Sequence, residues 1–276
     1  MSEKAEQIEI LKVRFDNVTN QEALEKALDL IKTGKQTYIT TPNPEILLEA
    51  ENNHGFREVL NNSALNIPDG IGILWASKYL DATKNSKSKP IKFAKWLGSI
   101  LAVPFHPSYI RTVLKERVTG IDLMENLCKE SVKYGYRIFL LGAKEGTAEL
   151  TKEILEKRYN GLNIVGTFSG SPKIEDEPPI LEKINTATPD ILFVAYGAPN
   201  QELWIARNLA KMPPVKLAIG IGGAFNFIAG IRKRAPKWMQ NLGIEWMYRL
   251  IQEPSRIKRI YNATIKFSTK VLKKNL

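Results

Sequence analysis

Residue types that build many metal and catalytic sites are scarce in this chain. Among 276 residues there are one cysteine, Cys128, and two histidines, His54 and His106. One cysteine excludes a disulfide within the chain, and three such residues cannot supply a zinc site with ordinary ligand spacing. Cys128 stands at helical spacing among Leu and Met in LMENLCKES, so we expect it to pack in a core. This cysteine usage is typical of a reducing compartment.

Long apolar runs are also missing. No segment approaches eighteen uninterrupted apolar residues, so we predict no membrane-spanning helix. The N-terminal segment MSEKAEQIEILKVRF is polar and lacks the apolar stretch of a signal peptide. We therefore expect a cytosolic protein. Its 43% hydrophobic and 9% aromatic residues are enough for a substantial core and exclude a disordered chain.

Negative charge is nearly absent from two segments. Residues 81–117 carry eight Lys or Arg against two acids, and residues 232–276 carry twelve against two. These segments hold +6 and +10 of a chain total of +11, so the remainder is mildly acidic. Basic extensions on an acidic body predict docking to an anionic partner, which could be a nucleic acid, a membrane face or a phosphorylated substrate.

Strand and helix patterns alternate along most of the chain. Apolar or β-branched runs predict strands at 36–41, 65–68, 136–142, 163–168, 190–195 and 216–223. Helical patterns lie between them at 20–34, from 44 onward, and at 71–80, 121–134, 144–158, 178–187 and 199–211. We expect Asn20 and Asn43 to cap the first two helices. Strands that are apolar on both faces predict an α/β fold, a Rossmann-like, mostly parallel sheet flanked by helices.

Small and polar residues gather where these strands end. The strand ends read TTPN, PDG, LGA, YGAPNQ and GIGGAF. Ligands of parallel sheets bind beyond the carboxyl ends of the strands, where backbone N–H groups can contact phosphate. Gly142, Gly197, Gly222 and Gly223 are therefore candidate nucleotide or phosphate contacts. GIGGAF lacks the third glycine of a dinucleotide fingerprint in register, which argues against a nicotinamide cofactor.

Asp69 is the best-placed candidate for a general base. It lies at a strand end in a chain almost without histidine, although Pro-Asp-Gly is also ordinary turn chemistry. No Asp-x-Asp pair follows a strand, so we expect no metal and no cofactor. The charge of a leaving group would then be met by Arg, Lys and helix N-termini.

The basic segments also carry apolar stripes. In KPIKFAKWLGSILAV the apolar residues are expected on one helical side, and a second stripe starts at Trp238 and continues beyond Pro254 to Leu272. Basic helices rich in Trp and Phe are typical of interfacial membrane anchors. One alternative is that these stripes pack on the body of the protein or on a sister subunit, so a homo-oligomer remains possible. A second alternative is nucleic-acid binding, for which no known module is present.

Several segments together resemble one family. They are TTPNPEILLEA, LNIPDGIGILWASK, ERVTGIDLM, FLLGA, VAYGAPNQELWI and GIGGAFNFIAGIRKRAPKWMQNLGIEWMYRLIQEPSRIKR. Their order, from about residue 10 to 265, is similar to that of the WecG/TagA/CpsF glycosyltransferases, glycosyltransferase family 26. The resemblance implies an inverting, metal-independent transfer from a UDP-sugar donor, such as UDP-N-acetylmannosamine, to a polyprenyl-diphosphate-linked amino sugar on the cytosolic membrane face.

The resemblance also implies residue roles. Asp69 matches the family's proposed base, which deprotonates the acceptor hydroxyl. Residues matching the substrate pocket are Thr41, Asn43, Arg117 and Gln201, and arginines matching a C-terminal appendage that closes over the site are Arg249, Arg256 and Arg259. We accordingly divide the chain into a catalytic body, 1–231, and a basic amphipathic appendage, 232–276.

Two departures from the family are visible. This chain inserts most of 81–115 where relatives have a short loop, for which we predict an added membrane or acceptor contact. Asn226 stands where most relatives are expected to carry Asp, which could mark a different donor. The alternative function is a non-catalytic nucleotide- or polyanion-binding protein that uses its basic arms on nucleic acid; the glycosyltransferase prediction excludes nucleic acid as a partner.

Overall fold

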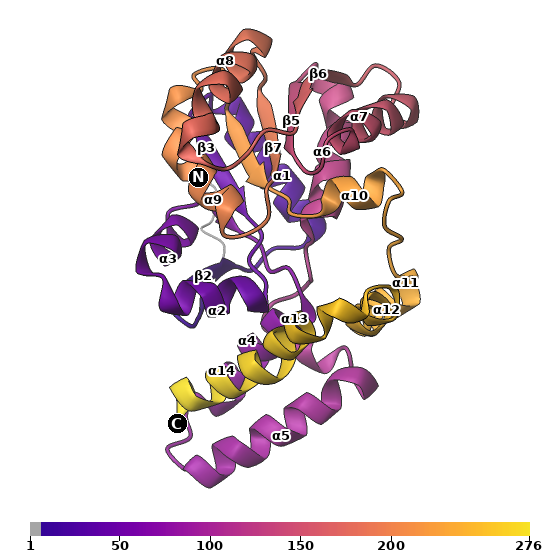
Figure 1. Cartoon of the computed structure of the whole chain (residues 1–276). Coiled ribbons are helices and arrows are strands. Elements are labelled where there is room, and N and C mark those ends of the chain that lie inside the picture. The colour runs from indigo at the N-terminus through magenta and orange to yellow at the C-terminus, as the bar shows by residue number, and fades with distance from the viewer. Residues whose placement is uncertain (1–6) are drawn as a thin grey trace.

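One six-stranded parallel sheet organises the protein, and a two-stranded antiparallel hairpin lies outside it (Figure 1). The computed structural model describes residues 7–276; residues 1–6, the start of the segment expected to lack a signal peptide, lie outside this range. The sheet order is β4–β3–β8–β7–β5–β6, which confirms the predicted α/β class. The strands are β1 (Gln7–Ile10), β2 (Val13–Asp16), β3 (Thr37–Thr40), β4 (Leu65–Asn66), β5 (Arg137–Gly142), β6 (Asn163–Phe168), β7 (Ile191–Ala195) and β8 (Leu217–Gly220).

Helices cover both faces of the sheet and build a second layer beyond its carboxyl edge (Figure 1). Within residues 7–276 none is long and apolar enough to cross a membrane. They are α1 (Asn20–Lys32), α2 (Pro44–Asn52), α3 (His54–Asn61), α4 (Ile71–Thr83), α5 (Lys89–Phe105), α6 (Gly120–Tyr134), α7 (Thr147–Arg158), α8 (Glu177–Ala187), α9 (Asn200–Asn208), α10 (Ala224–Ile228), α11 (Lys237–Asn241), α12 (Glu245–Gln252), α13 (Ile257–Tyr261) and α14 (Phe267–Asn275).

The central strands are buried on both faces, as their continuous apolar sequences predict. In β5, Ile138 and Leu140 join a core cluster with α1, α6 and α7, whereas Phe139 and Leu141 face a second cluster with α8 and α9. This alternation is the two-residue period of a strand. Cys128 is buried in the first cluster, and burial raises the pKa of its thiol, so it packs as expected.

The helix boundaries correct one of the two predicted caps. α1 is capped by Thr19, not Asn20, because Thr19 and Glu22 form a reciprocal capping box. Asn43 caps α2 as predicted, accepting hydrogen bonds from the first-turn backbone N–H groups. The polar N-terminal stretch, to which the sequence analysis assigned no element, contains the β1–β2 hairpin, where Ile8 pairs with Phe15.

The C-terminal helix shares a core with the body. Phe267 and Val271 of α14 are buried in a third cluster that includes Trp75 and Tyr79 of α4. The Trp75 and Tyr79 rings stack with centroids 5.6 Å apart, and Phe267 meets Trp75 edge-on at 6.4 Å. The predicted single stripe through the tail is therefore wrong at its end, because these α14 residues face inward. The division at residue 232 stays a prediction.

Helix α5, which lies within the predicted insertion, has one broad apolar side that is partly buried and partly exposed. Trp96 and Ile100 pack against the third cluster, and the Trp96 indole N–H donates to the Ser268 carbonyl at 3.0 Å. Phe93, Leu97 and Leu101 are exposed instead. At about 100° per residue these five positions span about 140°, so they share one side of the helix as predicted. Tertiary packing covers one edge of that side and leaves the other exposed.

We predict that Phe267→Ala destabilises the whole chain. The buried ring contacts Trp75, so its loss should lower the free energy of unfolding by about 3–5 kcal/mol through lost burial and a residual cavity. Chemical denaturation measures this change. Ile265→Ala is the control, because Ile265 is exposed and its loss should cost little. A Phe267→Ala variant as stable as the control would contradict the shared core.

Candidate active site

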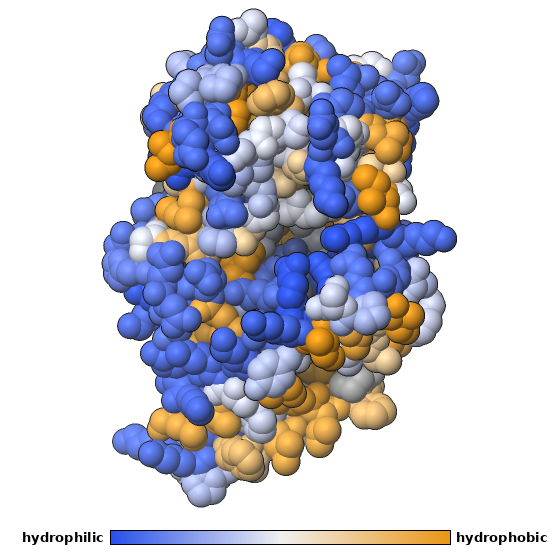
Figure 2. Space-filling model, viewed as in Figure 1, coloured by the Kyte–Doolittle hydropathy of each residue, from blue (hydrophilic) through white to orange (hydrophobic). Residues whose placement is uncertain are grey.

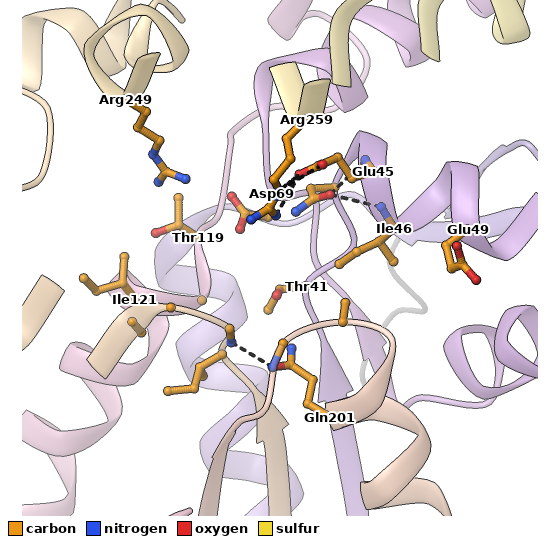
Figure 3. Close-up of a pocket in the computed structure, with 18 of the residues that line it drawn as sticks. Thr41, Glu45, Ile46, Glu49, Asp69, Thr119, Ile121, Gln201, Arg249 and Arg259 are labelled. Carbon is orange, nitrogen blue, oxygen red and sulfur yellow. Dashed lines mark hydrogen bonds and ion pairs between the residues drawn. The ribbon is translucent and has the colours of Figure 1, made fainter. Parts of the chain in front are cut away.

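A cavity of about 600 Å³ lies between the carboxyl edge of the sheet and the C-terminal helices (Figures 2 and 3). Loops after β3, β4, β7 and β8 line one side, and residues of α12 and α13 line the other. Ten of the twelve predicted site residues meet there: Thr41, Asn43, Asp69, Gly197, Gln201, Gly222, Gly223, Arg249, Arg256 and Arg259. Segments far apart in the sequence thus build one site, and the role of each residue stays a prediction.

Asp69 is held at the cavity by its backbone. Its N–H donates to the Pro42 carbonyl at 3.2 Å, and the preceding Pro68 carbonyl accepts from the Val118 N–H at 3.1 Å. Gly70 follows with φ of 124°, a left-handed conformation that favours glycine and turns the chain into α4. The Pro-Asp-Gly turn therefore connects β4 to α4 and also directs the Asp69 side chain into the cavity (Figure 3).

The surroundings of Asp69 tune its carboxyl group. Burial raises the pKa of Asp69 to about 6, while the positive charges of Arg117 and Arg249 lower it and the negative charges of Glu245 and Asp122 raise it. The side chain is half-buried at the cavity surface, so its carboxylate can still meet a substrate. A group with this pKa is ionised near neutral pH and accepts a proton more readily than an ordinary aspartate.

Glu245 connects the arginines nearest Asp69. Its carboxylate accepts from Arg117 at 3.0 Å and from Arg249 at 2.5 Å. The Arg117 and Glu245 side chains are only 14% and 11% exposed, so this pair is largely shielded from water. Arg249 also lies over the Phe227 ring, with its guanidinium carbon 5.2 Å from the centroid. Arg117 is thus placed behind the cavity wall, whereas Arg249 lines the cavity.

The other appendage arginines are paired with acids as well. Arg259 donates to both carboxylate oxygens of Glu45, at distances from 2.9 to 3.2 Å (Figure 3). Glu253 accepts from Arg256 at 3.2 Å and from Arg232 at 2.8 Å. Burial and the neighbouring charge of Arg259 lower the pKa of Arg256. Because these positive charges lie close together, this side of the cavity can bind a further anion, such as a diphosphate.

Gln201 joins two loops of the cavity. Its Oε1 accepts from the Gly197 N–H at 3.1 Å and the Gly222 N–H at 3.0 Å, and its Nε2 donates to Glu202 at 2.8 Å. The side chain is buried, so this network positions the loops. The two glycine N–H groups are engaged by Gln201, and this arrangement does not fit their predicted use as phosphate donors. The arginines are the available anion ligands on the opposite wall.

Gly142 is not among the residues that line the cavity. It ends β5 with φ of 102°, and a Cβ atom there would lie 2.9 Å from the Ala195 carbonyl carbon. Close packing of β5 against β7 therefore accounts for glycine at this position. Asn226, where relatives are expected to carry Asp, also lies outside the lining, although its neighbours Ala224 and Phe227 belong to it.

Several polar and charged lining residues were missed by the sequence analysis. Arg234 donates to both oxygens of Asp122, at 2.6 and 2.8 Å, across 112 residues of sequence. Asn262 and Lys266 line the cavity from a π-helical turn, Asn262–Lys266, that joins α13 to α14. π-turns inside helices are frequent at functional sites, but no residue pattern marks one in a single sequence. Across residues 7–276, no three His, Cys, Asp or Glu side chains group as metal ligands.

Comparison with known proteins identifies the family. The model described as "Glycosyl transferase WecG/TagA/CpsF family" matches residues 8–104 and 105–276. The chain belongs to this family. As a WecG/TagA/CpsF protein it is a glycosyltransferase, which confirms the resemblance and favours the enzyme over the nucleic-acid-binding alternative.

Two curated relatives are similar to this WecG/TagA/CpsF chain over most of its length. The N-acetylglucosaminyldiphosphoundecaprenol N-acetyl-beta-D-mannosaminyltransferase of Bacillus spizizenii is 32% identical over 239 residues, covering 87% of this chain and 80% of that protein. The protein of the same name from Bacillus subtilis is 33% identical over 235 residues, covering 85% and 78%.

We predict that Asp69→Asn stabilises the protein at neutral pH. An unfolded Asp69 has an ordinary pKa of 3.8 and the folded one about 6, so ionisation costs folding free energy that builds up between these values. Below about pH 4 both states are protonated and the variant should match the wild type. Above about pH 7 it should be more stable by about 2–3 kcal/mol, as measured by urea unfolding.

The control for this measurement is Asp81→Asn. Asp81 is a surface carboxyl whose pKa is lowered mainly by a hydrogen bond from Lys84, so its replacement should not stabilise the protein at any pH. Equal stability of Asp69→Asn and wild type at pH 7.5 would show that Asp69 pays no burial cost.

Proposed function

We propose that this glycosyltransferase moves an N-acetylmannosamine residue, or a close relative, from a UDP-sugar to a polyprenyl-diphosphate-linked N-acetylglucosamine. The observation that carries the proposal is one cavity holding both Asp69, with a pKa of about 6, and the three arginines of the C-terminal helices. The names of the two Bacillus relatives supply the sugar and the acceptor. The product would enter cell-surface polysaccharide or teichoic acid synthesis.

In the proposed reaction Asp69 acts as the general base. Its carboxylate takes the proton from an acceptor sugar hydroxyl while that oxygen attacks the anomeric carbon of the donor. The bond from this carbon to the UDP oxygen breaks, its electron pair leaves with UDP, and the anomeric configuration inverts. Thr41 and Asn43 lie beside the base in the cavity and can orient the sugars.

The arginine wall would stabilise the leaving diphosphate. Guanidinium groups present forks of N–H donors that match phosphate oxygens and keep their charge at any physiological pH. Arg249, Arg256 and Arg259 line the cavity, and each already has an acidic partner that an incoming diphosphate can displace or share. Such a wall supplies positive charge without a metal ion.

We further propose that the protein works at the inner face of the cell membrane, because its acceptor is lipid-linked. Trp238, Trp246 and Ile251 on the C-terminal helices are 59%, 41% and 76% exposed, within a segment of charge +10. Removing residues 232–276 would also remove Phe267 from a core, so deletion is a poor test of this role. Point changes at Trp238 and Trp246 are the better test, because both side chains are exposed and their replacement should cost little stability.

The direct test of the activity is release of UDP from a panel of UDP-sugars. We expect acceptor-dependent release with one donor, unchanged by a chelator, because the arginines supply the positive charge at the leaving group. Asp69→Asn should lower turnover by at least about a hundredfold while the protein stays folded. Asp81→Asn serves as the matched control. Acceptor-dependent release by Asp69→Asn at the wild-type rate would refute the assignment of the base.

The pH profile tests the surroundings of the base. In the free enzyme kcat/KM should rise with pH around the Asp69 pKa of about 6, because the carboxylate form is the active one. Arg117→Gln removes a charge that lowers this pKa and should move the rise to higher pH, whereas Glu245→Gln should move it to lower pH. Steady-state rates between pH 5 and 8 measure both shifts, and shifts of the same sign would contradict the arrangement.

A further inference from the structure

The inserted helix α5 presents an apolar stripe to solvent. Phe93, Leu97, Leu101 and Phe105 follow one another at four-residue spacing and are 51%, 47%, 60% and 80% exposed. Residues four apart lie on the same face of a helix, so these side chains form one continuous surface, which we call the α5 stripe. Nothing among the contacts of α5 with α4 and α14 covers it.

The α5 stripe is held rigidly against the C-terminal helices. On the inner side of α5, Lys92 donates to the Asn275 carbonyl and the Trp96 indole donates to the Ser268 carbonyl at 3.0 Å. At the far end of the insertion, Arg111 donates to the Asn241 carbonyl of α11 at 3.0 Å. The insertion is therefore fastened to both ends of the segment 241–275.

Exposed apolar residues of α11 and α12 lie at the same end of the molecule as the α5 stripe. In Figure 2 apolar residues gather along the end of the molecule where Figure 1 places α5, α11 and α12. On α11 and α12 the exposed members are Trp238, Trp246, Met247 and Ile251. Arg249 of the same α12 lines the cavity, so one short helix connects the apolar end of the molecule to the arginine wall.

We infer that the α5 stripe is a second membrane-contacting surface, which lies flat in the interfacial layer of an anionic bilayer together with α11 and α12. The inference rests on the proposed function, because a lipid-linked acceptor puts the protein at a membrane. The inference adds a role for α5, which would help to hold the cavity at the bilayer. An acceptor diphosphate in the headgroup layer could then reach the arginines that line the cavity.

Charge distinguishes a membrane from a second copy of the chain as the occupant. Lys87, Lys89 and Lys95, in and just before α5, and Lys233 and Lys237, in and just before α11, are exposed. A two-fold dimer would set this surface against itself and bring like charges together. An anionic leaflet instead attracts each Lys or Arg near its surface, and the apolar stripe gains burial among the acyl chains.

The test compares two matched double variants of the full-length protein. Leu97→Ser/Leu101→Ser removes the centre of the α5 stripe, and Leu150→Ser/Ile174→Ser replaces two exposed aliphatic side chains on α7 and the loop before α8. All four positions are on the surface, so both variants should unfold at similar urea concentrations. Each is sedimented with vesicles of phosphatidylglycerol and phosphatidylcholine and assayed with two acceptors, one embedded in the vesicles and one short-chain and water-soluble.

The α5 variant should partition onto vesicles at least about tenfold more weakly than wild type, and the control should not change. Its turnover should fall with the embedded acceptor and stay unchanged with the soluble one. Vesicle binding equal to wild type would overturn the inference, as would a wild-type dimer that the α5 variant converts to monomers. Failure of the proposed function would give a different result. The wild-type protein would then turn over neither acceptor, whether or not it binds vesicles.

Discussion

The carboxylate of Glu245 joins two parts of the chain that are 128 residues apart, and the architecture of the site depends on that junction. On one side it accepts from Arg117, in the loop that enters α6; on the other it accepts from Arg249, in the wall of the cavity. A largely buried carboxylate between two guanidinium groups is stable only while both partners remain, because an unpaired buried charge is costly. The C-terminal helices are thereby held over the carboxyl edge of the sheet.

The same junction balances charge around the base. Asp69 feels the positive charges of Arg117 and Arg249 and the negative charge of Glu245 at once, so burial, the largest influence, is left to set its pKa near 6. Without Glu245 the two arginines would lower the pKa of Asp69 further. The cavity thus combines strong positive charge for a diphosphate with a carboxylate that still accepts a proton, two demands that oppose each other electrostatically.

The sheet was predictable because its strands are apolar on both faces and end in Gly, Pro and Asn, which mark boundaries within a few residues. The strand-end part of the site followed from the same pattern: Thr41, Asn43 and Asp69 come directly after β3 and β4. The arginine wall came only from family resemblance. Its partners escaped prediction because Glu45 pairs with Arg259 across 214 residues, and no local pattern shows which distant charges meet. The sequence also could not show which edge of the apolar side of α5 is covered, since only tertiary packing decides this.

The π-helical turn between α13 and α14 has a consequence for how sequences of such proteins can be compared. From Ile257 to Asn275 the chain is one continuous helix in which Asn262 and Lys266 face the cavity and Phe267 and Val271 face the core. Each residue of a helix turns the side chains by about 100°, so a single residue gained or lost at the turn would change which face of α14 meets α4. An insertion or deletion of one residue there is therefore not neutral. An alignment gap placed within 262–266 would indicate that the C-terminal helices pack differently over the cavity.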